Sequence, residues 1–242
     1  LYLDAGSVLD TSGNAVIFTE FTVPFSLIAD TVDPQLVSFD LNVDNNLDHL
    51  LLTFDETVLA SSLIPNRLTL REAASSVGGS VQSHTISDGV VLTADDTVVK
   101  FQLSKADRDS LKLLLNLTTG VPNTFLTCSA GFIKDTAQEP NGAVATELQA
   151  SNFTTDSTAP WIESFVVDMH LGLVTLYFNE PVLSDSLNVT KVTLQPSNQS
   201  LTADRFTLTG GVTGSENGLL LVVNMTLEDM NAIKQHEGLL IS

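Results

Sequence analysis

Apolar and polar positions alternate along most of the chain and predict short β-strands joined by polar turns, arranged as an antiparallel sandwich. The runs Leu50–Phe54 and Leu173–Phe178 are apolar and rich in strand-favouring residues, as expected of buried strands. Two segments differ. Near 104–113 and 226–236 a hydroxyl residue is followed three positions later by Asp, which matches a helix start because both side chains satisfy unpaired backbone N–H groups. We therefore expect one short helix in each half of the chain.

The chain repeats itself with a period of about 125 residues, a length typical of a whole domain rather than of a solenoid repeat. Asp30–Pro34 is echoed by Asp156–Pro160, and the proline of each segment stiffens a linker because it fixes its own φ and extends the residue before it. Further matches follow in the same order along the chain. They pair 52–59 with 176–183, 62–63 with 186–187, 68–70 with 192–194, and 104–112 with 226–234.

The two copies of the repeat are not equally complete. The first, 30–155, ends in a predicted closing hairpin, whereas the second, 156–242, stops just past its predicted helix. Residues 1–29 match the missing hairpin, because Leu1–Val8 corresponds to Leu126–Ile133. We therefore divide the chain into a closing hairpin of a preceding or neighbouring repeat, a complete repeat and an incomplete repeat.

Short motifs in both repeats resemble those of a known family. Thr-Phe-Asp-Glu-Thr-Val at 53–58 and Tyr-Phe-Asn-Glu-Pro-Val at 177–182, each after an Asp-x-x-x-Pro linker, resemble the bacterial-type immunoglobulin-like repeats of surface-layer proteins and adhesins, and Asp10–Asn14 belongs to the same pattern. The resemblance implies an all-β chain of tandem immunoglobulin-like β-sandwiches with one short helix per repeat, the second lacking its closing hairpin. It also implies an extracellular or cell-surface location and a modular, non-catalytic role.

A sandwich that lacks its last two strands exposes its core and an unpaired sheet edge, so it favours completion by added strands. We expect residues 1–29 of one chain to complete residues 156–242 of the next, and such a head-to-tail contact builds filaments. Two alternatives remain: the neighbouring repeat belongs to the same longer chain, or the segment is an arbitrary window of a repeat protein. The apolar residues expected to make the contact are Leu1, Leu3, Val8, Val16, Phe18, Phe21, Val23, Phe25 and Leu27.

The charge of the chain argues against several partners. Ten basic and 29 acidic residues give a formal net charge of -19, which repels nucleic acids and anionic membrane surfaces. No apolar run is long enough for a membrane span. Cys128 is the single cysteine, so an intrachain disulfide is excluded, and its position on a strand indicates a small buried apolar residue.

The sequence holds no recognisable catalytic motif. The four histidines are far apart, share no position in the repeat and lack metal-ligand spacing, and there is no phosphate loop or nucleophile elbow. We therefore expect no enzyme but a structural subunit of an extracellular filament or appendage, and the alternative is a spacer stalk of a cell-adhesion or carbohydrate-binding surface protein. The first predicts self-association with a regular repeat, and the second predicts affinity for glycans or cells.

Asn-x-Ser/Thr sequences predict N-linked glycans if the chain passes through a secretory pathway. The better candidates, Asn152, Asn188 and Asn198, lie in predicted loops, whereas Asn224 lies at a strand end where burial competes. The acceptor asparagines are Asn116, Asn152, Asn188, Asn198 and Asn224.

Calcium is a weak candidate ligand. Asp40, Asn42 and Asp44 place oxygen ligands at alternating positions, as in a calcium loop, but Asn and Asp are favoured in polar turns in any case. Carboxylates around the two linkers are a second candidate, because they would share a cation at a junction between repeats. They are Asp30, Asp33 and Glu56 in the first repeat and Asp156 and Glu180 in the second.

Overall fold

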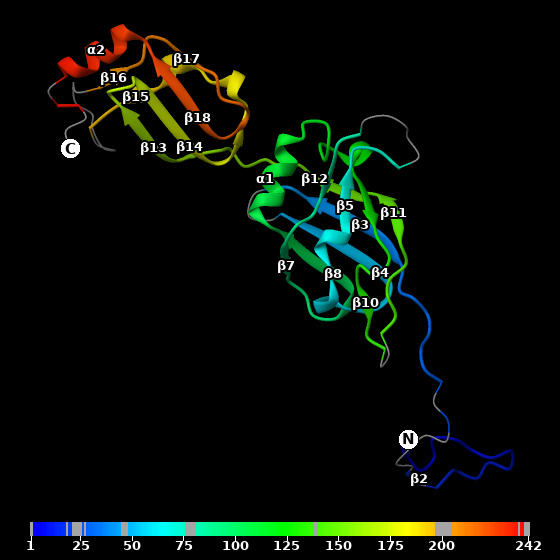
Figure 1. Ribbon diagram of the computed structural model, residues 1–242. Helices are drawn as coiled ribbons and strands as arrows, with labels where there is room; N and C mark the ends of the chain where they lie inside the picture. Colours follow the sequence, from blue (N-terminus) through cyan, green and yellow to red (C-terminus); the bar gives the residue numbers. More distant parts are fainter. Residues whose placement is uncertain are drawn as a thin grey trace.

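The computed structural model describes residues 2–17, 19–20, 26, 28–44, 48–75, 81–137, 140–196, 205–236 and 238–239. Within these residues the chain is mostly β-sheet, and its two α-helices are α1 (Lys105–Leu113) and α2 (Leu227–Gln235) (Figure 1). The predicted all-β character and both predicted helices are confirmed.

The first unit consists of two sheets. One has the strand order β12-β3-β4-β8-β7 with β10 added to β4, and the other has the order β11-β9-β5-β6. β12 and β3 pair in parallel, which departs from the expected purely antiparallel arrangement, and the other pairs are antiparallel. The strands are β3 (Leu36–Asn42), β4 (His49–Leu59), β5 (Leu68–Arg71), β6 (Ser83–Thr85), β7 (Gly89–Val91), β8 (Asp96–Leu103), β9 (Phe125–Cys128), β10 (Lys134–Asp135), β11 (Thr146–Gln149) and β12 (Asn152–Thr154).

Both sheets of the first unit contribute to one hydrophobic core. Phe39 and Leu52 from the first sheet and Leu70 and Leu126 from the second are at most 1% exposed and belong to the same cluster. Phe132, from the turn after β9, joins them and stacks on Phe54 with ring centroids 5.9 Å apart. The strands that follow α1 are therefore part of this core and not an appendage to it.

The second unit has fewer strands and a smaller core. Its main sheet has the order β13-β14-β18-β17, and β15 pairs with β16 separately. The core centres on Val174, Leu194, Leu208, Val223 and Ile233. The strands are β13 (Ile162–Asp168), β14 (Leu173–Val182), β15 (Thr193–Leu194), β16 (Phe206–Thr207), β17 (Gly211–Thr213) and β18 (Gly218–Met225). Short 3-10 turns are η1 (Ala60–Ser62), η2 (Pro65–Arg67), η3 (Val121–Asn123), η4 (Ser184–Ser186) and η5 (Val189–Lys191).

The two helices begin in the same way. The side chain of Ser104 accepts a hydrogen bond from the N–H of Asp107 at 3.1 Å, and the side chain of Thr226 accepts one from the N–H of Asp229 at 3.0 Å. Both aspartates are 1% exposed and accept further hydrogen bonds from the loop that precedes β7 or β17, from Ser87 N–H to Asp107 and from Thr209 N–H to Asp229, each at 3.0 Å. The helix starts that the sequence predicts are thus anchored to the sandwich by buried carboxylates.

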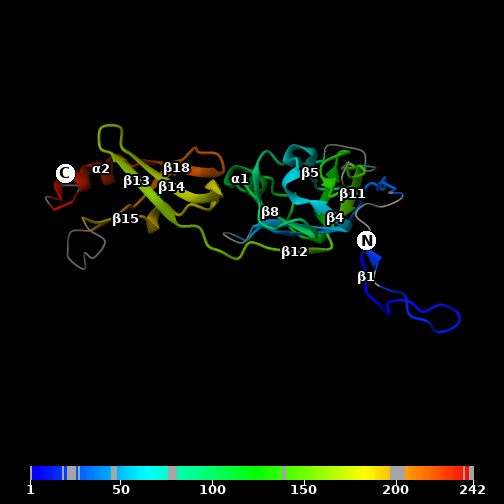
Figure 2. The ribbon, with the colours of Figure 1, turned by 90° about the horizontal axis from the view of Figure 1, so that it is seen from below.

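Residues before the first unit form a separate small hairpin. β1 (Tyr2–Leu3) pairs antiparallel with β2 (Thr19–Glu20). Figures 1 and 2 show this hairpin beyond the end of the first unit that is opposite the second unit. Val8 is 60% exposed and Ile28 is 91% exposed, so the hairpin and the segment after it leave apolar side chains in solvent.

Candidate assembly interface

The N-terminal hairpin has the same strand register as the hairpin that closes the first unit. Leu3 pairs with Thr19 as Cys128 pairs with Thr146. Residue numbers in the closing hairpin exceed those in the N-terminal hairpin by 125 on the first strand and by 127 on the second. The same two differences relate the neighbouring residue pair of each hairpin. That pair is Tyr2 with Glu20 in the N-terminal hairpin and Thr127 with Glu147 in the closing hairpin.

The turns of the two hairpins also share their hydrogen bonds. In the closing hairpin, Asp135 Oδ1 accepts from the N–H of Asn141 at 2.9 Å, and Oδ2 accepts from the Asn141 side chain at 2.8 Å. In the N-terminal hairpin, Asp10 accepts the same two bonds from Asn14, both at 2.8 Å. Each aspartate N–H also donates to the carbonyl of its asparagine. The two turns therefore share their hydrogen bonds on either side of the tip, although Asp10 and Asn14 are two residues closer in sequence than Asp135 and Asn141.

The second unit exposes a sheet face that the first unit covers. Leu36 and Phe39 on β3 are 5% and 1% exposed, because β11 and β12 of the closing hairpin pack along that strand. Ile162 and Phe165 occupy the same register positions on β13 and are 51% and 55% exposed. The described part of the second unit contributes no strand to cover them, so its core is open on this side.

The N-terminal hairpin carries the complementary exposed residues. Ile133 in the closing hairpin is fully buried, whereas its counterpart Val8 is 60% exposed. Val16, the counterpart of the buried Ala143, is half-buried, and so is Leu3. The other residues predicted to make the contact lie outside the described residues or outside the described side chains. They are Leu1, Phe18, Phe21, Val23, Phe25 and Leu27.

The second unit keeps features of the edge that binds the closing hairpin in the first unit. In the first unit Ser62 Oγ accepts from the N–H of Lys134, in the closing hairpin, at 2.8 Å and donates to a carbonyl three residues back at 2.7 Å. Ser186 makes the second of these bonds at the same distance. β15 likewise has β16 on one side and, among the described residues, no strand on the other, whereas its counterpart β5 lies between β6 and β9. Both features leave room for strands in the register of the closing hairpin.

A lysine and two carboxylates join the first unit to the second. Lys112, in the last turn of α1, lies 2.6 Å from Asp156 in the linker and is also hydrogen-bonded to Glu180 on β14. Glu180 is only 4% exposed, so the ammonium group neutralises a buried charge. The same three residues line a junction cavity of about 440 Å³.

Asp44 fastens the linker to the loop after β3. Its carboxylate accepts hydrogen bonds from the hydroxyl of Thr158 at 2.8 Å and from the N–H and hydroxyl of Ser157 at 3.1 and 2.9 Å. These bonds, that of Thr158 foremost, hold the pKa of Asp44 well below its usual value. Asp44 therefore binds the linker, and a cation site shared with Asp40 and Asn42 stays a prediction.

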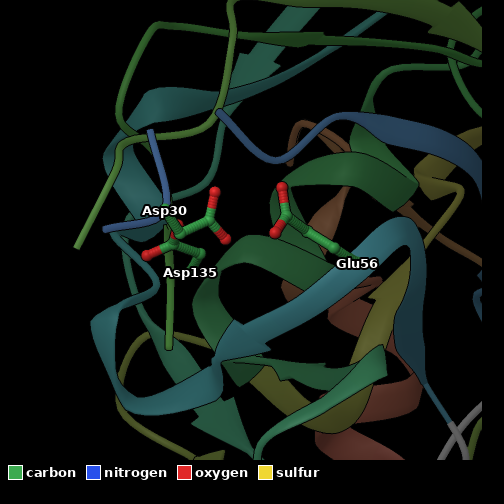
Figure 3. Close-up of side chains that lie close together, drawn as sticks. All are labelled: Asp30, Glu56 and Asp135. Carbon is green, nitrogen blue, oxygen red and sulfur yellow. The ribbon is translucent and has the colours of Figure 1, made fainter. Parts of the chain in front are cut away.

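Three other carboxylates converge at the opposite end of the first unit. One oxygen each of Asp30, Glu56 and Asp135 lies within 4.8 Å of the other two (Figure 3). Glu56 Oε1 is buried and has no hydrogen-bond partner. Burial raises the pKa of Glu56, and the charges of the two neighbouring aspartates raise it further. Asp30 and Glu56, two of the three carboxylates expected around the first linker, meet here. Asp33 is not in the group, and Asp135 is a member that the sequence did not single out.

The described sequon asparagines are all exposed. Asn116 follows α1, Asn188 caps η5, and Asn152 and Asn224 lie on β12 and β18. Asn152 is thus on a strand rather than in the predicted loop, and the burial that competed at Asn224 is not found. Asn198 lies outside the described residues. Glycosylation at these positions stays a prediction.

Two residues with reactive side chains have structural roles. Cys128 is 1% exposed and burial raises its pKa to about 12, which fits the predicted small core residue. His84 Nε2 lies 2.8 Å from the buried Asp107, which is anchored in the helix cap and not in an open cleft.

Comparisons with protein-family models and with curated proteins find no match for this chain. Among the described residues, no helix is long and apolar enough to cross a membrane.

Proposed function

We propose that the chain is a non-enzymatic structural subunit that assembles head to tail through its N-terminal hairpin into an extracellular filament or cell-surface appendage. In this assembly, residues 1–29 of one copy lie on the open sheet of residues 156–242 of the next. Each completed unit is then an immunoglobulin-like β-sandwich, as the motifs of the sequence suggest.

The observation that carries this proposal is the pair of matching hairpins. One of them closes the first unit, and the other has the same register and turn hydrogen bonds but leaves Val8 exposed. The second unit exposes Ile162 and Phe165, whose counterparts are buried beneath the closing hairpin. Donor and acceptor are thus present in one chain, which favours a second copy as the source of the missing strands.

The energetics agree with such a contact. Burying a large apolar side chain contributes roughly 1.5–3 kcal/mol, and strand addition also pairs the backbone groups of an open edge. Because the hairpin and the open sheet lie at opposite ends of the chain (Figure 2), the contact is heterologous. A heterologous contact that does not close into a ring gives a filament.

Negative-stain microscopy and sedimentation velocity of the full chain test the proposal. We expect filaments with a regular axial repeat, and we expect Phe165→Glu to abolish them because it places a charge where the hairpin would pack. Val212→Asp is the matched control: Val212 is 68% exposed on the same sheet, and it pairs with the exposed Asn224 on the outer face. A chain that stays monomeric at high concentration, or that assembles regardless of Phe165→Glu, would contradict the proposal. In the first case the open sheet would take a later segment of the same polypeptide.

A further inference from the structure

The junction between the two units provides a template for a contact between copies. At that junction, Lys112 from the last turn of α1 binds Asp156 of the linker and Glu180 of β14. The linker and strand of the first unit carry the same two acids, Asp30 and Glu56, at matching positions. Within the described residues, neither carboxylate of this second pair forms an ion pair with a basic side chain.

The lysine is repeated as well. Ser104 and Thr226 cap their helices equivalently, and eight residues after each cap comes a lysine, Lys112 in α1 and Lys234 in α2. Lys234 is exposed and forms no ion pair with any residue that the structure describes. One half of the contact is therefore present at each end of the chain.

We propose that the carboxylates of Asp30, Glu56 and Asp135 form a socket for the ammonium group of Lys234 from a second copy. This pairing rests on the proposed head-to-tail assembly. When the hairpin of one copy completes the second unit of another, α2 of that unit takes the place before residue 30 that α1 takes before residue 156. Lys234 then approaches Asp30 and Glu56 as Lys112 approaches Asp156 and Glu180.

The electrostatics of the socket fit a cation that arrives on assembly. Three carboxylates lie together, Glu56 Oε1 is buried without a partner, and Asp135 is 1% exposed (Figure 3). Uncompensated charge of this kind destabilises the free chain, and an ammonium group relieves it. The same logic adds Asp10 of a second copy to Lys112, Asp156 and Glu180, because Asp10 is the counterpart of Asp135.

Zero-length carbodiimide cross-linking of the assembled full chain tests the pairing. A mixture of ordinary and ¹⁵N-labelled chains identifies bonds between copies by mass spectrometry. We expect Lys234 to be linked to Glu56 or Asp30 of another copy. The link from Lys112 to Asp156 or Glu180 forms within every chain and serves as the positive control. Assembled chains that show the control link and no link from Lys234 would overturn the pairing and leave the hairpin contact intact.

Charge reversal gives a second test. Lys234→Glu and Glu56→Lys should each raise the concentration needed for assembly about tenfold or more, and the double variant should recover most of the loss because the pair is restored with inverted signs. Lys105→Glu makes the same charge change at an exposed lysine whose ion pair is with Asp109 of its own helix, and it should have little effect on assembly. If Lys234→Glu leaves assembly unchanged, and assembly requires Ca²⁺ and is lost on adding a chelator, the socket holds a metal ion and not Lys234. A wild-type chain that never assembles would overturn the proposed function and this pairing with it.

Discussion

Phe39 and Phe165 lie beside matching partners, Leu52 and Leu176, in two strand pairs of the same register, yet Phe39 is 1% exposed and Phe165 is 55% exposed. Both partners are buried, so both phenylalanines face the interior of their units. Coverage by the closing hairpin is what separates them.

Truncation of these two side chains should therefore have unequal effects. Phe39→Ala should lower the free energy of unfolding of the first unit by about 3–5 kcal/mol, because it leaves a cavity in a closed core. Phe165→Ala should change the stability of the unassembled chain by less than about 1 kcal/mol, since its side chain is already half in solvent. Urea denaturation in dilute solution measures both. Equal losses would mean that the sheet face of the second unit is covered in the monomer.

The buried Asp107 should make the first unit sensitive to acid. Burial alone would raise its pKa, but hydrogen bonds from Ser104, Ser87, His84 and the N–H of Asp88 outweigh burial and lower it. A lowered pKa gives stability that is complete above the unfolded value near pH 4 and is lost as the pH falls through the folded value.

Asp107→Ala is the corresponding variant. We expect it to lose roughly 1–3 kcal/mol at pH 7, where several donors are left unpaired, and to lie much closer to the wild type at pH 2–3. Denaturant titrations of both proteins at the two pH values give the comparison. An effect that is independent of pH would show that the carboxylate charge is not the origin of the stabilisation.

The buried ion pair between Asp48 and Arg108 gives a third prediction. Arg108 donates to Asp48 Oδ1 at 2.6 Å, and Asp48 is 1% exposed. Asp48→Ala should lower the free energy of unfolding by about 3–5 kcal/mol, because it leaves a largely buried guanidinium group without its carboxylate partner. The double variant Asp48→Leu with Arg108→Met should be more stable than either single variant, and Met230 occupies the counterpart of position 108 in the second unit. Simple additivity of the two losses in urea denaturation would argue against the pair acting as one element.

Cys128 should be unreactive in the folded chain. Burial raises its pKa to about 12 and leaves 1% of its surface exposed, so little thiolate is present or accessible at pH 8. A thiol reagent followed by absorbance should modify it at the rate at which the first unit opens, and the rate should rise with denaturant. Rapid stoichiometric modification of the native chain would contradict this burial and the core position of β9.

The sequence by itself determined the features that depend on neighbouring residues. Alternation marked the strands, and Ser104 and Thr226 marked both helix starts, because a cap acts on backbone groups three residues away. The internal repeat was visible because it preserves residue types in order, and it also matched Leu1–Val8 with residues of the closing hairpin. None of this needed a contact between distant segments.

Only the tertiary structure decided which of the matched residues are buried and what they bind. Ile162 matches Leu36 in the repeat, but Leu36 is buried by strands that lie more than a hundred residues after it in the chain. Among the described residues no such strands cover Ile162, so it is exposed. The parallel pairing of β12 with β3 and the meeting of Asp135 with Asp30 and Glu56 likewise join segments far apart in the chain. The sequence offered Asp156 and Glu180 as a candidate calcium site, whereas the structure pairs both carboxylates with Lys112. This pairing forms because α1 ends where the ammonium group of Lys112 reaches both of them.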